Sequence, residues 1–454
     1  MSTRAPEVAT EGRVANHIVD LQQWIDLRPV SSGQWIILAL CFIVAVLDGL
    51  DAAILGFIAP ALMHDWQITP AVFGSVMGAG MFGLACGAFA VGPCADRFGR
   101  KGMLLAAVAC FGSFSLLSAF AQDVGQLALL RFVTGMGLGA AMPVANVLLC
   151  EYLPSHRRGF LMTLMYTGFN LGSGCGGFVS AWLIPSHGWQ GPLIFAGLLP
   201  LATVPLLLLL LPESIRLLAL RDGNDRRIAK ILQRYGGNFA AGTHFVCNET
   251  KAQKPGAGQL FRDGYMPLTL RLWVANFMGL LVIYLLTGWL PTLLGARGID
   301  LRHAAMVTAM FQIGGTVGAL LVGWLMDRAA PRKVIAGAYM AGAVSLVLLG
   351  LFGQQDLGLI VLVSAAGFCM SGAQTGLNAH APTLYPTLTR GTGVSWMLGV
   401  GRFGAIVGSS AGGILLATPL GAGGVITLLG VPAVFAGFSM IGNRPRADNV
   451  QVKA

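Results

Sequence analysis

Two aspartates three residues apart lie inside a long apolar stretch of this chain. Asp48 and Asp51 fall in the middle of residues 34–62, a run long enough to cross the ~30 Å hydrocarbon core of a bilayer as a helix. A charged side chain near the bilayer centre costs about 2.5–3.5 kcal/mol, so packing alone does not account for two of them. Their spacing places both carboxyl groups on one helical face. Because both cannot ionise cheaply there, we expect at least one to bind and release a proton. The alternative is a buried structural pair with an arginine.

Two arginines also fall inside apolar stretches. Arg131 lies about two turns into residues 124–150, and Arg402 lies near the middle of residues 391–417. A guanidinium at this depth needs a partner or a cavity, and it matches a carboxylate in bidentate fashion. We expect Arg131 to pair with the two aspartates when no ligand is bound, and a carboxylate substrate to compete for Arg131 or Arg402. A purely structural ion pair is the alternative for Arg131.

Polar and aromatic side chains in other apolar stretches are candidates for a ligand pocket. Tyr284 and Trp289 lie in residues 269–294, and Asn378 lies in residues 355–380. Apolar walls with a few hydrogen-bonding groups are typical of small-molecule pockets. The alternative is hydrogen bonding between helices, which polar residues in lipid often make. Further candidates of the same kind are Tyr166, Asn170, Asn276, Gln374 and His380.

The composition indicates an integral membrane protein. Of 454 residues, 55% are hydrophobic and only 11% are charged, whereas soluble domains carry about 25% charged residues. The 63 glycines are expected where helices approach closely in lipid. The pattern predicts an all-α protein with twelve transmembrane helices, at residues 34–62, 70–91, 102–121, 124–150, 160–185, 189–211, 269–294, 303–326, 333–353, 355–380, 391–417 and 420–441.

The net charge of +10 follows from membrane topology and implies no nucleic-acid partner. With the N-terminus inside, nearly all of the 29 Lys and Arg residues fall in tails, in cytoplasmic loops or at their span edges; the exceptions are Arg131, Arg297, Arg302 and Arg402. This distribution predicts that both termini are cytoplasmic. Residues 1–33 lack the apolar core of a signal peptide. Their apolar residues Ile18, Leu21, Trp24 and Ile25 predict a short amphipathic helix on the inner membrane surface.

The chain contains an internal repeat. Residues 34–211 and 269–441 each hold six predicted spans, and a polar, basic linker at residues 212–268 separates them. The loop GPCADRFGRK at 92–101 recurs in altered form as GWLMDRAAPRK at 323–333. Two pseudo-symmetric halves of six helices are typical of secondary transporters, whose substrate site lies near the midplane between the halves. The remaining segments, 1–33 and 442–454, are predicted to be cytoplasmic tails.

These motifs resemble the major facilitator superfamily. The loops at 92–101 and 323–333 are similar to its signature loop, and RFVTGMGLG at 131–139 is similar to its fourth-helix motif. The D-G-x-D of residues 48–51, GAAMPVAN at 139–146 and YLLTGWLPTLL at 284–294 resemble a narrower group, the aromatic acid:H⁺ symporters. The resemblance implies proton-coupled import of a benzoate-like or hydroxybenzoate-like acid across a bacterial inner membrane. Residues 172–177 lack the Gly-Pro pair associated with antiporters, which favours symport.

Charged clusters beside the two signature loops are candidates for a conformational latch. Ion pairs that form in one conformation and break in another bias a two-state equilibrium. We expect these clusters to hold the outward-facing state, with Glu151 as a partner for Arg97; the alternative is that they only fix topology. The residues concerned are Asp96, Arg97, Arg100 and Glu151 in the first half, and Asp327 and Arg328 in the second.

Several other chemistries find no support in the sequence. No Lys follows a Gly, so a Walker A loop is absent and energy must come from a gradient. GSSAG at 408–412 fits the G-x-S-x-G pattern of hydrolases but falls inside a span, where it indicates helix packing. The eight cysteines form no CxxC pair and are expected to be packing residues. We expect a transporter rather than an enzyme, working as a monomer without a metal or a cofactor.

The predicted function is therefore proton symport of a small aromatic carboxylate by alternating access. Three alternatives stay open at this point. A proton antiporter that exports organic compounds would use the aspartates equally well, although Arg131 and Arg402 would repel a cationic cargo. A symporter of a non-aromatic organic acid and a receptor that binds without transport are the other two.

Overall fold

The computed structural model describes residues 18–219, 225–235, 237, 239, 243–246, 265–352, 356–385 and 387–441. The predicted C-terminal tail, residues 1–17 of the predicted N-terminal tail, Cys247 and much of the predicted linker lie outside the described residues. The backbone of Asp96 belongs to a helix, but its side chain is also outside what is described.

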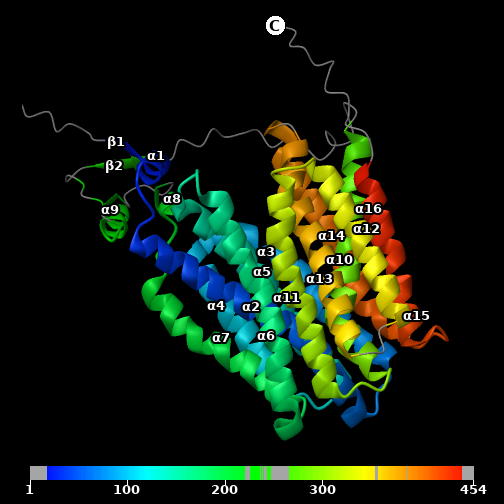
Figure 1. Ribbon diagram of the computed structural model, residues 1–454. Coiled ribbons are helices and arrows are strands. Elements are labelled where there is room, and N and C mark those ends of the chain that lie inside the picture. The colour runs from blue at the N-terminus through cyan, green and yellow to red at the C-terminus, as the bar shows by residue number, and fades with distance from the viewer. Residues whose placement is uncertain are drawn as a thin grey trace, which may run out of the picture.

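Long helices dominate the described chain and form two groups (Figure 1). The first group consists of α2 (Ser32–Trp66), α3 (Pro70–Phe98), α4 (Arg100–Ser118), α5 (Val124–Tyr152), α6 (Arg158–His187) and α7 (Gln190–Leu210). The second consists of α10 (Met266–Gly295), α11 (Leu301–Met326), α12 (Pro331–Phe352), α13 (Asp356–His380) with the short 3-10 helix η2 (Ala381–Leu384), α14 (Thr387–Leu416), and α15 (Gly421–Leu428) followed by α16 (Gly430–Ile441).

Eleven helices in the described part of the chain are long and apolar enough to cross a membrane. The twelfth predicted span is α6, which has 30 residues but is less apolar because Gly, Ser, Thr and Asn interrupt it. It still lies inside the bundle, packed against α2 and α11. The predicted twelve-helix, all-α membrane fold is confirmed.

Each group repeats the same helix pairings. In the first, α2 packs on α6, α3 on α5, and α4 on α7; in the second, α10 packs on α14, α11 on α13, and α12 on α16. Glycines allow the closest of these contacts. A Cβ atom at Gly49 of α2 would collide with the carbonyl oxygen of Phe169 in α6, and one at Gly172 of α6 would collide with that of Val46. The two helices therefore pack backbone to backbone, as small residues permit in membranes.

A small substructure, here called the cap, lies at one end of the first group (Figure 1). It contains β1 (Ile18–Asp20), α1 (Leu21–Asp26), α8 (Ile215–Ala219), α9 (Asp225–Gln233) and β2 (His244–Val246), and β1 pairs with β2 in parallel. The predicted amphipathic helix at the N-terminus is partly correct: Leu21–Asp26 is helical, but Ile18–Asp20 is a strand. Leu21 and Ile25 are buried in the protein core rather than placed on a membrane surface, because β2, α8 and α9 provide apolar partners for them.

The two groups touch at the ends of the helices remote from the cap. There α2 meets α10 near Gly56 and Gly288, α3 meets α14 near Gly74, and α6 meets α11 near Gly177. Toward the cap, the two groups diverge (Figure 1). The structure is thus closed on the side opposite the cap.

Candidate functional site

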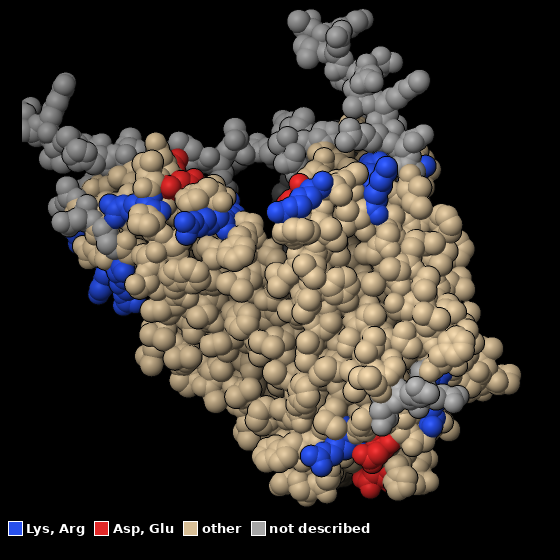
Figure 2. All heavy atoms as spheres, viewed as in Figure 1, with Lys and Arg blue, Asp and Glu red and all other residues tan. Residues whose placement is uncertain are grey.

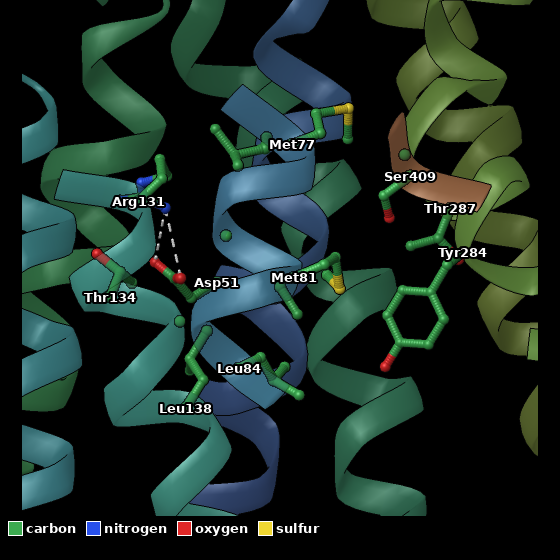
Figure 3. A pocket seen from close by; sticks show the side chains of 15 residues that line it. Asp51, Met77, Met81, Leu84, Arg131, Thr134, Leu138, Tyr284, Thr287 and Ser409 are labelled. Carbon is green, nitrogen blue, oxygen red and sulfur yellow. Dashed lines mark hydrogen bonds and ion pairs between the residues drawn. The ribbon is translucent and has the colours of Figure 1, made fainter. Parts of the chain in front are cut away.

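Asp51 and Arg131 form a buried ion pair between α2 and α5. Arg131 Nη1 lies 3.4 Å from Asp51 Oδ2, and each side chain is only 2% exposed. Both face each other in the close view of Figure 3. Deep in the bundle a guanidinium needs such a partner. The predicted pairing of Arg131 with one of the two aspartates is therefore present, and the partner is Asp51.

Two serines of α4 complete this ion pair. Ser115 Oγ donates to Asp51 Oδ1, while Arg131 donates from Nη2 to Ser115 Oγ and from Nε to Ser118 Oγ, each over 3.0 Å. Both serines are fully buried. Neither serine could be singled out from the sequence, because a serine in a helix rich in small residues carries no signal of its own. Arg131, Ser115 and Ser118 together hold Asp51 in a fixed position.

Asp48 lies on the same helix but is held differently. Its side chain is 3% exposed, and Oδ1 has no hydrogen-bond partner among the described residues. Arg402 of α14 and Asp51 both act on it electrostatically. A buried carboxylate with an unsatisfied oxygen is unfavourable, and binding a proton removes its charge. Asp48 is thus the less constrained of the two carboxyl groups.

Arg402 connects the two groups of helices. It is half-buried on α14 and interacts electrostatically with Tyr284 of α10, with Tyr166 of α6 and with Asp48 of α2. Two of the predicted substrate-binding residues, Arg402 and Tyr284, are therefore brought together beside one of the predicted proton-binding residues. A single cation is shared by side chains from both groups.

A narrow cavity crosses the interface beside this cluster (Figure 3). Its volume is about 30 Å³, which suits water rather than an aromatic ring. Methionine and leucine side chains separate its two polar ends. The lining includes Asp51, Arg131 and Thr134 from the first group, Met77, Met81 and Leu84 between, and Tyr284, Thr287 and Ser409 from the second group.

Two predicted substrate-binding residues, Trp289 and Asn378, lie apart from the cluster around Arg402. Trp289 has no accessible surface, and its Nε1 donates to the carbonyl oxygen of Ser409 over 2.7 Å while its ring meets Phe73 edge-on. It joins α10 to α14 and α3 in this conformation. Asn378 is exposed near the cap-side end of α13 and does not line the cavity.

A second buried network lies within the second group. Tyr339 donates to Gln374 Oε1 over 3.0 Å, Gln374 Nε2 donates to Asn276 Oδ1 over 2.5 Å, and Asn276 Nδ2 donates to the carbonyl oxygen of Met397 over 2.8 Å. Every member is buried. For Asn276 and Gln374 the alternative of hydrogen bonding between helices holds. The network ends on the α14 turn that immediately precedes Arg402.

The first signature loop is held by an acidic residue that the sequence analysis missed. Glu213 Oε1, just after α7, accepts hydrogen bonds from the backbone N–H groups of Arg100 (2.9 Å) and Lys101 (3.1 Å) at the start of α4. A carboxylate is favourable at a helix N-terminus. The chain turns between α3 and α4 at Gly99, whose φ of 94° favours glycine. A Leu-Pro-Glu-Ser sequence directly after an apolar span was the available signal.

In the first copy of the latch, the residue that contacts Glu151 differs from the predicted one. Glu151 contacts Arg100, not Arg97 as predicted, and it also accepts a hydrogen bond from Ser214 Oγ over 2.5 Å. Arg100 follows the turn at Gly99, which directs it toward α5, whereas Arg97 is exposed and lies over the ring of Phe98.

In the second copy, Asp327 directly follows α11 as its C-cap residue, and the Arg328 guanidinium lies 3.8 Å from the centroid of the Trp324 ring. Among the described residues, Asp327 and Arg328 form no ion pair with each other or with the first copy.

Comparison with known proteins places the chain in a family. A family model described as Major Facilitator Superfamily matches residues 41–305 and 272–453. The chain is 55% identical over 426 residues to the gallate transporter of Pseudomonas putida, covering 94% of this chain and 95% of that protein. It is 47% identical over 422 residues to the 4-hydroxybenzoate transporter PcaK of Pseudomonas aeruginosa, covering 92% and 94%.

The fold is similar to that of the xylose transporter XylE from E. coli in its partially occluded inward open conformation. The TM-score is 0.72 and the sequence identity 17%, and the match covers 90% of this chain and 97% of that chain. At this identity the likeness concerns the fold alone. The chain therefore belongs to the major facilitator superfamily of membrane transporters.

Proposed function

We propose that this protein imports a small aromatic carboxylate together with protons by alternating access. The observation that carries the proposal is the shared position of Arg402, which acts on both Asp48 and Tyr284 at the junction of the two helix groups. Relatives named as gallate and 4-hydroxybenzoate transporters support an aromatic acid as the cargo. A single chain supplies both groups, so we take the monomer as the transport unit.

The proposed orientation places the cap in the cytoplasm of a bacterium, with the protein in the inner membrane. Lys and Arg side chains gather along the cap side (Figure 2), in keeping with the positive-inside rule. Because the helix groups touch on the opposite side, we interpret this conformation as inward-facing.

Charge balance at Arg402 supplies the coupling between proton and substrate. When a substrate carboxylate binds Arg402, Asp48 loses its countercharge and becomes stable only as the neutral acid. Each anion that enters therefore favours the entry of one proton, and the pair is electroneutral. On the cytoplasmic side, loss of the proton restores the charge of Asp48, which competes for Arg402 and promotes release of the substrate. Asp51 is tied to Arg131 and Ser115 in this conformation and is not part of the exchange at Arg402.

Uptake of labelled acids tests the proposal. Cells that express the protein should accumulate benzoate, 4-hydroxybenzoate or gallate above the level of cells with an empty vector. Accumulation should increase as the external medium is made more acidic, because more protons are available to Asp48 from outside. A protonophore should reduce the internal concentration to about the external one, since electroneutral symport depends on the pH difference.

Two outcomes would reject this function. Accumulation that persists with the protonophore would exclude proton symport. Faster efflux of preloaded compound on external acidification would instead indicate the antiport alternative. Xylose serves as the matched control cargo, because the likeness to XylE concerns the fold alone, and no uptake of it is expected.

The network that ends beside Arg402 gives a further prediction. Removing the phenol hydroxyl in Tyr339→Phe leaves Gln374 Oε1 buried without its donor, which costs about 1–3 kcal/mol. Because the network holds the α14 turn before Arg402, we expect KM for the aromatic acid to rise several-fold with a smaller change in kcat. Tyr385→Phe is the matched control: Tyr385 is also buried and donates to Thr269 over 3.2 Å, but away from Arg402. Equal KM changes in both variants would contradict this role.

A further inference from the structure

Helix α9 carries a strongly basic face that forms no ion pair with the part of the chain that the structure describes. Ile228 and Leu232 are buried at helical spacing, while Arg226, Arg227 and Lys230 are exposed on the other side. None of these three cations forms an ion pair with any described residue. The helix is therefore fixed by its apolar side and presents its charges outward.

The acidic groups nearby are already engaged. Asp225, at the start of α9, accepts from the backbone N–H of Phe245 over 3.0 Å and lies 2.9 Å from His244 Nδ1. Glu213 binds the backbone N–H groups at the start of α4. A hydrogen-bonded carboxylate keeps its charge, but the single carboxylate of α9, Asp225, cannot offset three cations, so α9 retains a positive surplus.

The basic residues of α9 lie at the level of the bilayer surface. Leu208 and Leu209 at the end of α7 are 55% and 75% exposed, as expected of side chains that face lipid. Lys101 Nζ donates to the carbonyl oxygen of Leu208 over 2.6 Å, and Arg234, directly after α9, acts electrostatically on Lys101. The basic residues thus begin where the lipid-facing leucines end. Figure 1 places α9 beside this end of the first helix group, and Figure 2 shows Lys and Arg gathered on the same flank.

We propose that α9, together with Lys101 and Arg234, binds the phosphate groups of anionic phospholipids in the adjacent leaflet. Clustered Lys and Arg next to a membrane span are attracted to such lipids. The contact would anchor the cap to the bilayer. The cap in turn holds the first helix group, because Asp26 accepts from Ser155 N (2.7 Å) and Ser155 Oγ (2.9 Å) in the α5–α6 connection. The inference is independent of the transported substrate.

Lipid retention by the purified full-length protein tests this proposal. The protein is equilibrated in mixed micelles that hold equal amounts of dioleoyl phosphatidylglycerol and dioleoyl phosphatidylcholine, and retained lipids are counted by native mass spectrometry. Wild type should retain phosphatidylglycerol in excess. The variant with Arg226→Gln, Arg227→Gln and Lys230→Gln should lose at least about half of that excess, because three of the cations are gone. The variant with Arg226→Lys and Arg227→Lys keeps the charge and should behave as wild type.

Retention of the full excess by the glutamine variant would overturn the proposal. Displacement of phosphatidylglycerol by about 10 mM inorganic phosphate would overturn it as well, since it would indicate a site for a free anion rather than a lipid surface. Salt provides a measurement that needs no variant: the excess in wild type should fall sharply at about 0.5 M NaCl, where the Debye length is only a few ångströms. An excess that salt does not change would equally reject it. Loss of the excess to an added acidic peptide at low salt would favour a protein partner instead.

Discussion

Asp48→Asn is expected to abolish proton-driven accumulation of the aromatic acid while preserving its exchange across the membrane. Asparagine is neutral at every pH, as protonated Asp48 would be, so Arg402 remains available to the substrate without any proton. Transport then no longer depends on the pH difference. With a difference of about one pH unit, electroneutral symport of one proton supports roughly tenfold accumulation, because each factor of ten corresponds to about 1.4 kcal/mol. The variant should accumulate the acid to about the external concentration.

Two assays on the same proteoliposomes distinguish coupling from transport. Net uptake driven by an imposed pH difference should be lost in Asp48→Asn, whereas exchange of internal unlabelled acid for external labelled acid should persist. Accumulation equal to wild type would remove Asp48 from the mechanism. Loss of both activities in a folded variant would show that Asp48 does more than carry a proton. If wild type itself moves no aromatic acid, the proposed substrate class is wrong, irrespective of Asp48.

Asp51→Asn is the matched comparison, since it makes the same chemical change three residues away. This substitution removes the countercharge of a buried ion pair. Arg131 would remain 2% exposed with only neutral partners, namely Ser115, Ser118 and the new amide. Breaking a buried pair by removing one charge typically costs about 3–5 kcal/mol. We therefore expect less folded protein in the membrane and loss of exchange together with accumulation.

The number, order and approximate ends of the spans could be predicted because a membrane helix must be long and apolar. Residues 34–62 became α2, Ser32–Trp66. The small difference has local causes: Ser31 and Gln34 form a capping box that starts the helix earlier, and Gln67, with φ of 50°, ends it later. Composition shows the apolar run, but the cap residues decide where the helix begins and ends.

The ion pair between α2 and α5 could also be predicted in outline, because an arginine inside a membrane needs a carboxylate. The division of roles between Asp48 and Asp51 could not be predicted from the sequence. A spacing of three residues puts both on one face, and the choice is made by Ser115 of α4, which contacts Asp51. Such a contact depends on how α4 packs against α2, which the sequence of either helix does not determine.

Two further contacts could not be predicted for a related reason, namely that the partner is distant in sequence. Trp289 could face a ligand or another helix, and it is the Ser409 carbonyl of α14 that takes its N–H. Glu151 could reach Arg97 or Arg100, and the turn at Gly99 directs Arg100 toward it. In both cases residue type and depth were informative, whereas direction required the fold.

Gly56→Leu is expected to reduce transport strongly by preventing closure on the side opposite the cap. A Cβ at Gly56 of α2 would lie 2.6 Å from the carbonyl oxygen of Thr287 and 2.7 Å from that of Gly288 in α10. These are backbone atoms, so no rotamer change relieves the clash. Overpacking typically costs about 1–3 kcal/mol, which corresponds to a roughly 5- to 150-fold change in the balance between two states. The inward-facing state should lose population, and the outward-facing state should gain it.

Labelling from outside reports this shift directly. Ser410 of α14 packs against Gly74 and Gly78 of α3 in the closed arrangement, so Ser410→Cys should react slowly with a membrane-impermeant maleimide. Adding Gly56→Leu should raise its rate, because the helix groups separate on that side. Gly337→Leu is the matched control, since a Cβ there meets nothing within 4 Å, and it should change neither labelling nor transport. Normal transport by Gly56→Leu, or lost transport with unchanged labelling, would show that contact between α2 and α10 at Gly56 does not close the transporter.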